Sequence, residues 1–197
     1  MQTQPTRPSV PTRPGFLTGQ LLVAMPELTD PRFAQSVIYL CAHTPEGAMG
    51  LVVNHPIEQP SFEELLRQLD ISPAPPARRI DLCAGGPVEN ARGFVLHTTD
   101  WTADDSLVVD ERIALTASLD VLKSIAGGHG PEHGLLALGY AGWGPGQLDQ
   151  EIQENAWLPL PAPVELVFDA GHATKWRRAL ATLHIDPVNL SGTAGHA

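Results

Sequence analysis

The feature that most constrains this fold is a pair of uninterrupted apolar segments joined by a short turn. The first, SVIYLCAH (36–43), is rich in β-branched and aromatic residues, and the second, GLVVN (50–54), follows it closely. A strand that is apolar at nearly every position has both faces buried. The pair therefore predicts a hairpin that turns across residues 44–47, with its first strand in the centre of a sheet.

Other short strand segments, each bounded by turn-forming residues, lie at 16–26, 79–88, 91–100, 106–110, 134–143 and 164–169. Apolar residues at helical spacing predict four helices, at 62–72, 116–126, 148–156 and 171–184. These elements do not alternate strictly between strand and helix as a parallel sheet requires. The pattern favours an α+β domain, with a mostly antiparallel, curled sheet or partial barrel and about four packed helices.

The chain of 197 residues suits one domain. We expect residues 15–197 to form it, because residues 1–14 are rich in Pro, Thr, Arg and Gln and predict a disordered tail. The N-terminus contains no apolar segment typical of a signal peptide. No window approaches the roughly 18 apolar residues of a membrane span, so we expect no contact with a membrane.

The charge is strongly acidic, with 22 Asp and Glu against 12 Lys and Arg and a formal net charge of −10. That charge repels nucleic acid, so we expect no direct nucleic-acid binding. The two small basic groups, Arg78-Arg79 and Lys175/Arg177/Arg178, are interpreted as solvated surface. The two cysteines, Cys41 and Cys83, lie in apolar segments and indicate reduced, buried thiols in a cytoplasmic protein.

The most unusual segment is GYAGWGPGQLDQE (139–151), where the apolar period changes from that of a strand to that of a helix. A glycine-rich turn before a helix can bind phosphate through unpaired amides. This segment has neither the Lys-Ser/Thr of a P-loop nor a dinucleotide fingerprint, and Pro145 removes one amide. The segment is interpreted first as a strand-to-helix junction, in which Pro145 begins the helix.

Polar residues border the apolar face of the helix that follows. Gln147, Glu151 and Asn155 recur every four residues, so they would lie along one stripe. They could converge on a ligand, or they could hydrogen-bond the backbone of neighbouring loops. Asn54, at the end of an apolar strand, could likewise cap a turn or line a cleft, and the turn is the favoured interpretation.

The sequence offers little support for a metal or for a familiar catalytic centre. His129 and His133 are four residues apart, but Gly130-Pro131 between them prevents a regular helix. No cysteine or carboxylate completes a zinc-like spacing, and no GxSxG elbow is present. We therefore expect no metal and no cofactor.

Taken together, the segments GQLLVAMPELTDPRFAQSVIYLCAHTPEGAMGLVVNHP, GGPV, GFVLH and LALGYAGWGPGQLDQEIQENAWL resemble the AlgH/YqgE family over residues 15–197. The resemblance implies a bacterial, cytoplasmic, single-domain α+β protein of a kind often described as a transcriptional regulator. It implies no catalytic residues. The positions that carry it are Met25, Pro26, Asp30, Pro31, Gly50, Asn54, Gly85, Gly86, Pro87, Gly139, Gly142, Trp143, Gly144, Gln147, Leu148, Glu151 and Trp157.

These observations predict a non-enzymatic binding or regulatory protein whose partner is another protein or a small ligand. The alternative is an enzyme with Glu151 as its acid/base in a glycine-lined cleft. The residues that we expect to form the cleft are Asn54, Gly85, Gly86, Pro87, Gly142, Trp143, Gly144, Gln147, Glu151 and Asn155.

Overall fold

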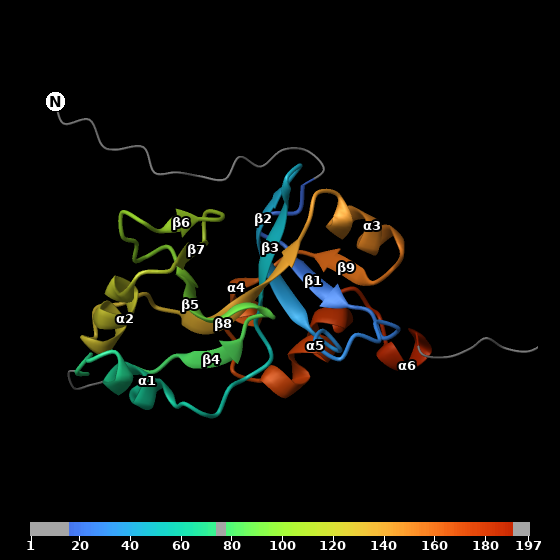
Figure 1. The fold of residues 1–197 in the computed structure, drawn as a ribbon. Helices are drawn as coiled ribbons and strands as arrows, with labels where there is room; N and C mark the ends of the chain where they lie inside the picture. The colour runs from blue at the N-terminus through green and yellow to red at the C-terminus, as the bar shows by residue number, and fades with distance from the viewer. Residues whose placement is uncertain (1–15, 74–77, 191–197) are drawn as a thin grey trace, which may run out of the picture.

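The computed structural model describes residues 16–73 and 78–190, and Figure 1 shows their arrangement. The predicted tail at 1–14 lies outside these residues. The strands are β1 (Leu21–Ala24), β2 (Val37–Thr44), β3 (Gly47–Val52), β4 (Asp81–Ala84), β5 (Val88–Thr98), β6 (Leu107–Val108), β7 (Ile113–Thr116), β8 (Gly134–Trp143) and β9 (Trp157–Leu160). The helices are α1 (Phe62–Gln68), α2 (Leu119–Ala126), α3 (Gln147–Gln153), α4 (Val164–Val167), α5 (His172–Ala181) and α6 (Pro187–Leu190).

All the described strands belong to one nine-stranded sheet, with β8 near its middle. The order is β6-β7-β5-β8-β3-β2-β1-β9, and β4 pairs with β8 outside this path. The first part of β8 pairs with β4 and β5, whereas its end pairs with β3. In Figure 1, β8 runs from the part of the sheet that carries β4 to β7 into the part that carries β1 to β3 and β9. Only the β4–β8 pair among the described strands is parallel, which confirms a mostly antiparallel α+β fold.

The predicted hairpin is present, and its strands are buried on both faces. Successive residues of β2 alternate between two apolar clusters: Val37, Tyr39 and Cys41 join one, and Ile38 and Leu40 join the other. The first cluster also contains residues from β5 and β8, and it fills the concave side of the curled sheet. An apolar run without alternation is therefore explained by a sheet that has packed layers on both sides.

The helices divide between the two sides of the sheet. The apolar faces of α1 and α2 cover the part of the sheet that carries β4, β5 and the start of β8. Leu148 of α3 packs against β1, β2 and β3 on the other part, and α4 and α5 close the concave cluster. Four helices have seven or more residues, as predicted, and two further helices of four residues complete the described set.

Three details of the sequence interpretation are wrong. Residues 164–169 were expected to form a strand, but they contain the short helix α4, which begins directly after Pro163. A short apolar segment next to prolines is compatible with a strand or with a helix, because it is too short for its periodicity to distinguish the two. The strands β7 and β9 were not predicted. The last long helix ends at Ala181, so Leu183, expected to point inward, is 39% exposed.

Lys175 also corrects the expectation of a solvated basic surface at 175–178. Its side chain is fully buried, and its Nζ donates to the carbonyl oxygens of Val53 at 2.8 Å and Val167 at 2.9 Å. Burial lowers the pKa of this amine to about 8. The positive charge therefore belongs to the interior, where it joins the end of β3 to α4, and it contributes nothing to a basic surface.

Candidate functional site

The glycine-rich segment is a strand-to-helix junction, as predicted. β8 ends at Trp143 and α3 begins at Gln147. Gly146 occupies the N-cap with a φ of 72°, a left-handed conformation that favours glycine. The amide of Gly144 donates to Gln147 Oε1 at 2.9 Å, which fixes the first turn of the helix. Pro145 precedes the cap and is not part of the helix, which corrects the expectation that it begins α3.

Glu151 holds two tryptophans in place. Its Oε2 accepts from the indole Nε1 of Trp143 at 2.8 Å and from that of Trp157 at 2.9 Å. Its Oε1 accepts from Gln147 Nε2 at 2.9 Å. The two indole rings meet edge to face, with centroids 5.9 Å apart. Because an indole N–H can only donate, the carboxylate is the acceptor that both rings require.

A cavity of about 400 Å³ opens beside this arrangement, and we call it the tryptophan cleft. It brings together five of the ten residues predicted for a cleft: Pro87, Gly142, Trp143, Gln147 and Glu151. The other lining residues come from the loop after β1, from the start of β5, from the end of α3 and from β9: Leu28, Asp30, Arg32, Phe33, Val88, Glu154, Ala156 and Trp157.

Aromatic side chains form a large part of the walls of the tryptophan cleft. Trp143 and Trp157 are 7% and 3% exposed, and Phe33 meets Trp157 edge to face at 5.7 Å. Arg32 lies over the Phe33 ring and pairs with Asp30 at 2.7 Å. Hydrogen bonds from Arg32 lower the pKa of the Asp30 carboxyl. Ring contacts and one ion pair therefore connect the side chains of this wall.

The other five predicted residues do not line this cavity. Asn54 is buried, and its side chain accepts from the Val37 amide at 2.8 Å and donates to the Gln35 carbonyl at 2.9 Å, so it anchors a turn. Asn155 is exposed beyond the end of α3, with a φ of 59°. The helix ends before the stripe reaches Asn155, so only its first two members converge.

Gly85 and Gly86 pack against the backbone of β8. A Cβ on Gly85 would overlap the carbonyl of Gly139, and one on Gly86 would overlap the backbone of Tyr140. Their role is close approach of two chain segments. Gly144 remains exposed beside Gln147, outside the cavity lining.

A second cavity adjoins the tryptophan cleft, and we call it the hairpin cavity. It measures about 510 Å³ and shares Val88, Gly142 and Trp143 with the cleft. Its remaining lining comes from the β2–β3 hairpin and from β8: Ala42, Thr44, Glu46, Gly47, Ala48, Met49 and Tyr140.

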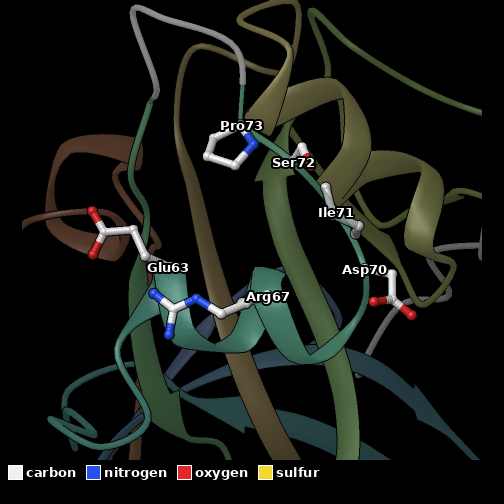
Figure 2. A pocket seen from close by; sticks show the side chains of 6 residues that line it. All are labelled: Glu63, Arg67, Asp70, Ile71, Ser72 and Pro73. Carbon is white, nitrogen blue, oxygen red and sulfur yellow. The ribbon is translucent and has the colours of Figure 1, made fainter.

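A third cavity, of about 480 Å³, lies next to α1. Figure 2 shows Glu63 and Asp70 on opposite sides of α1 and pointing away from each other, with Arg67 between them. Glu63 is also paired with Arg79. Because its charged groups do not converge, this cavity is a weaker candidate than the tryptophan cleft.

No three His, Cys, Asp or Glu side chains in 16–73 and 78–190 gather where they could hold a metal ion. No helix in those ranges is both long and apolar enough to cross a membrane.

Residues 21–188 match the sequence profile of the AlgH-like family. The chain belongs to this family. UPF0301 protein GOX1459 of Gluconobacter oxydans is 54% identical over 183 residues, covering 92% of this chain and 98% of the relative. UPF0301 protein Rru_A3059 of Rhodospirillum rubrum is also 54% identical, covering 93% and 95%. Both are bacterial, like the other AlgH-like proteins compared.

The fold agrees with a solved AlgH-like structure. The solution structure of the AlgH protein from Pseudomonas aeruginosa is 44% identical, with a TM-score of 0.74, and covers 95% of this chain and 99% of that one. Protein DIP2367 of Corynebacterium diphtheriae, at 22% identity and a TM-score of 0.68, shares the fold across 98% of this chain and 95% of its own.

Several cleft residues were absent from the sequence-based site. Trp157 and Asp30 were named only among the positions of the family resemblance, and Phe33 and Val88 were not singled out. The Asp30-Pro31 turn breaks the chain after β1. The Asp30-Pro31 turn is the sequence feature that predicts a loop, and not a core strand, at Phe33.

Proposed function

We propose that this AlgH-like protein is a non-enzymatic binding protein that recognises another protein at the tryptophan cleft. The observation that supports the proposal is that Glu151 accepts hydrogen bonds from two indoles beside a cavity with aromatic walls. Ligand sites are usually concave, mostly apolar and formed in advance, with a few polar groups that fix orientation. A small ligand is the second occupant that this cleft could take.

Any regulatory role would act through that partner. The formal charge of −10 opposes direct contact with DNA, and the buried position of Lys175 weakens one of the two small basic groups further. We place the protein in the cytoplasm, because both cysteines are free and buried, as is usual in a reducing compartment.

The alternative, an enzyme with Glu151 as its acid/base, has less support. A general base must lie within hydrogen-bond reach of a proton that it can abstract. Both oxygens of Glu151 already accept from N–H groups of two indoles and one amide. The carboxylate therefore acts as an anchor for the cleft wall.

Photo-cross-linking in the bacterium tests the proposal. A benzoylphenylalanine at Val88, which lines the cleft and is 37% exposed, should capture a protein. The same residue at Leu119, which is 43% exposed on α2, is the matched control and should not capture it. Equal capture at both positions, or none at Val88, would contradict a partner at this cleft.

A further inference from the structure

The strand β8 has an open edge at Gly142. On one side of β8, Gly142 lies opposite Met49 of β3. On the other side, β5 pairs with β8 only as far as Tyr140, which lies opposite Val88, and the residue before it, Pro87, has no N–H. Among the described strands, none pairs with β8 beyond this point on the β5 side. Gly142 is therefore paired on one side only, and it is exposed.

The backbone N–H and C=O of Gly142 face this open edge. In an antiparallel pair, successive residues direct these groups to alternate sides. The Val52 N–H points away from β2, because it donates to the Gly85 carbonyl at 2.9 Å. Every second residue of β3 before Val52 therefore faces β8, and these residues lie opposite Ala141 and Trp143. The backbone groups of Gly142, between those two, point away from β3.

The tryptophan cleft and the hairpin cavity lie on opposite faces of the sheet and meet at this edge. Met49 and Tyr140, which line the hairpin cavity, pack against the concave cluster. Leu28 and Phe33, which line the tryptophan cleft, pack against the cluster on the other face. Gly142 lines both cavities. Because a strand directs alternate side chains to opposite faces, a strand added at this edge would reach both.

The two outer edges of the described sheet are protected against pairing. At one end, β6 has only two residues. At the other end, Pro159 of β9 lies opposite Leu22. The Ala24 N–H donates to the Ser36 carbonyl, so Ala24 and, by alternation, Leu22 face β2, and Pro159 faces outward without an N–H. Short strands and prolines are the usual protection of an edge, whereas Gly142 leaves its edge accessible.

We infer that the open edge of β8 binds an extended segment of a protein partner, which pairs antiparallel with Gly142 and continues the β5–β8 ladder. The inference rests on the proposed function and names how the partner is recognised. The partner residue opposite Gly142 exchanges two backbone hydrogen bonds with it. Its side chain lies over the glycine in the hairpin cavity, and the residues on either side of it enter the tryptophan cleft.

This edge fits a segment of another protein better than it fits other occupants. A small molecule does not offer the alternating backbone groups and side chains that the edge and its two cavities match. A second copy, paired about a two-fold axis, would place Gly142 opposite Gly142 and leave both hairpin cavities unfilled. Residues 1–14 have a proline at every third position from Pro5 to Pro14, and their only other apolar side chains are Met1 and Val10. The partner segment therefore carries large apolar side chains at adjacent positions.

The probe is the peptide acetyl-Lys-Thr-Leu-Tyr-Leu-Thr-Lys-amide, compared with two N-methylated forms of the same charge. Methylation of the Tyr nitrogen removes the N–H that should donate to the Gly142 carbonyl. Methylation of the Leu before it changes an N–H that points away from β8. We expect the parent peptide to bind with a Kd below about 1 mM. The Tyr form should raise this Kd by about tenfold or more, and the Leu form by less than about twofold.

A ¹⁵N–¹H correlation titration measures these affinities and locates the contact. The Gly142 amide should shift on binding, whereas the indole resonances of Trp101 and Trp176, which line neither cavity, should stay in place. Val88→Asp places a charge in the lining that the cavities share and should raise the Kd by about tenfold or more. Leu119→Asp, at a residue 43% exposed on α2, is the matched control and should change it by less than about twofold.

Equal affinities of the two N-methylated peptides, or no binding of the parent peptide up to about 1 mM, would overturn the inference. A wild-type dimer that the parent peptide dissociates, measured by sedimentation, would overturn it in favour of contact between copies. Capture of a protein at Val88 in the bacterium, together with equal affinities of the N-methylated peptides, would refute strand addition alone. The absence of any cross-link at Val88 would refute the proposed function and, with it, the partner inferred here.

Discussion

Replacing Glu151 with alanine is expected to destabilise the protein by about 3 kcal/mol. The change removes the acceptor of two indole N–H groups whose rings are 7% and 3% exposed. A hydrogen bond to a charged group contributes roughly 1.5–3 kcal/mol, and an unsatisfied buried donor has a comparable cost. The third donor, Gln147 Nε2, belongs to an exposed residue and can turn to water. Taking roughly 1.5 kcal/mol for each of the two indole donors gives the value of about 3 kcal/mol.

Glutamine at the same position should cost about 1 kcal/mol, roughly the contribution of one ordinary hydrogen bond. Both indoles donate to a single oxygen, Oε2 of Glu151, and the amide oxygen of glutamine can occupy that place. Its NH₂ group would then face Gln147 Nε2, so one hydrogen bond is lost. The matched control is Glu154→Ala, which removes an exposed carboxylate bonded only to Gln150 and should cost less than about 0.5 kcal/mol.

Urea denaturation followed by tryptophan fluorescence and by circular dichroism measures these differences. For a domain of this size, about 3 kcal/mol corresponds to a fall in melting temperature of roughly 6–12 °C. The loss of unfolding free energy should be largest for Glu151→Ala, smaller for Glu151→Gln and smallest for Glu154→Ala. If Glu151→Ala were no more destabilised than Glu154→Ala, the carboxylate would not hold the tryptophans. The cleft could then not be treated as formed in advance.

Three further predictions concern the interior. The pKa of Lys175 is lowered from 10.5 to about 8, so between these values the unfolded chain holds a proton that the native state has lost. Unfolding free energy should therefore rise by about 3 kcal/mol from pH 7.5 to 10.5 relative to Lys175→Met, measured by urea titration at each pH. Gly86→Ala should cost more than about 2 kcal/mol by thermal melting, because φ is 153° and the Tyr140 backbone blocks a Cβ, whereas Gly144→Ala, with nothing closer than 3.8 Å, should be nearly neutral. Burial raises the pKa of the Cys83 thiol to about 12, so a disulfide reagent should modify the native protein far more slowly than the urea-unfolded chain.

The fold was largely predictable because its strongest signals are local. The two-sided burial of residues 37–41 appears in the sequence as an apolar run without alternation. The Ser61–Glu64 capping box, present in the structure, marks the start of α1 within the sequence itself. The helix at 164–167 was missed because its conformation depends on packing against the concave cluster. The sequence pattern carries no information about that distant contact.

The candidate site was predictable only where its residues are close in sequence. Trp143, Gln147 and Glu151 meet because a strand end and one helix face place them together. Phe33 enters from a loop more than a hundred residues earlier, and its position follows from the pairing of β1 with β9, which was not foreseen. Lys175 was assigned to the surface for a similar reason. Its two backbone acceptors lie on segments that only the folded chain brings together.

The hydrogen bonds of Glu151 also account for the spacing of four residues in this chain. Trp143 ends a strand, Gln147 and Glu151 lie one turn apart on the following helix, and Trp157 begins the next strand. These four side chains satisfy one another's hydrogen bonds within a short segment of chain. Their spacing is therefore accounted for by the hydrogen bonds that the two indoles make to one carboxylate. Under the proposed function, the choice of partner depends on the exposed residues that line the cleft, chiefly Val88 and Glu154. Substitution of those two residues should change which partner binds and leave the stability of the fold nearly unchanged.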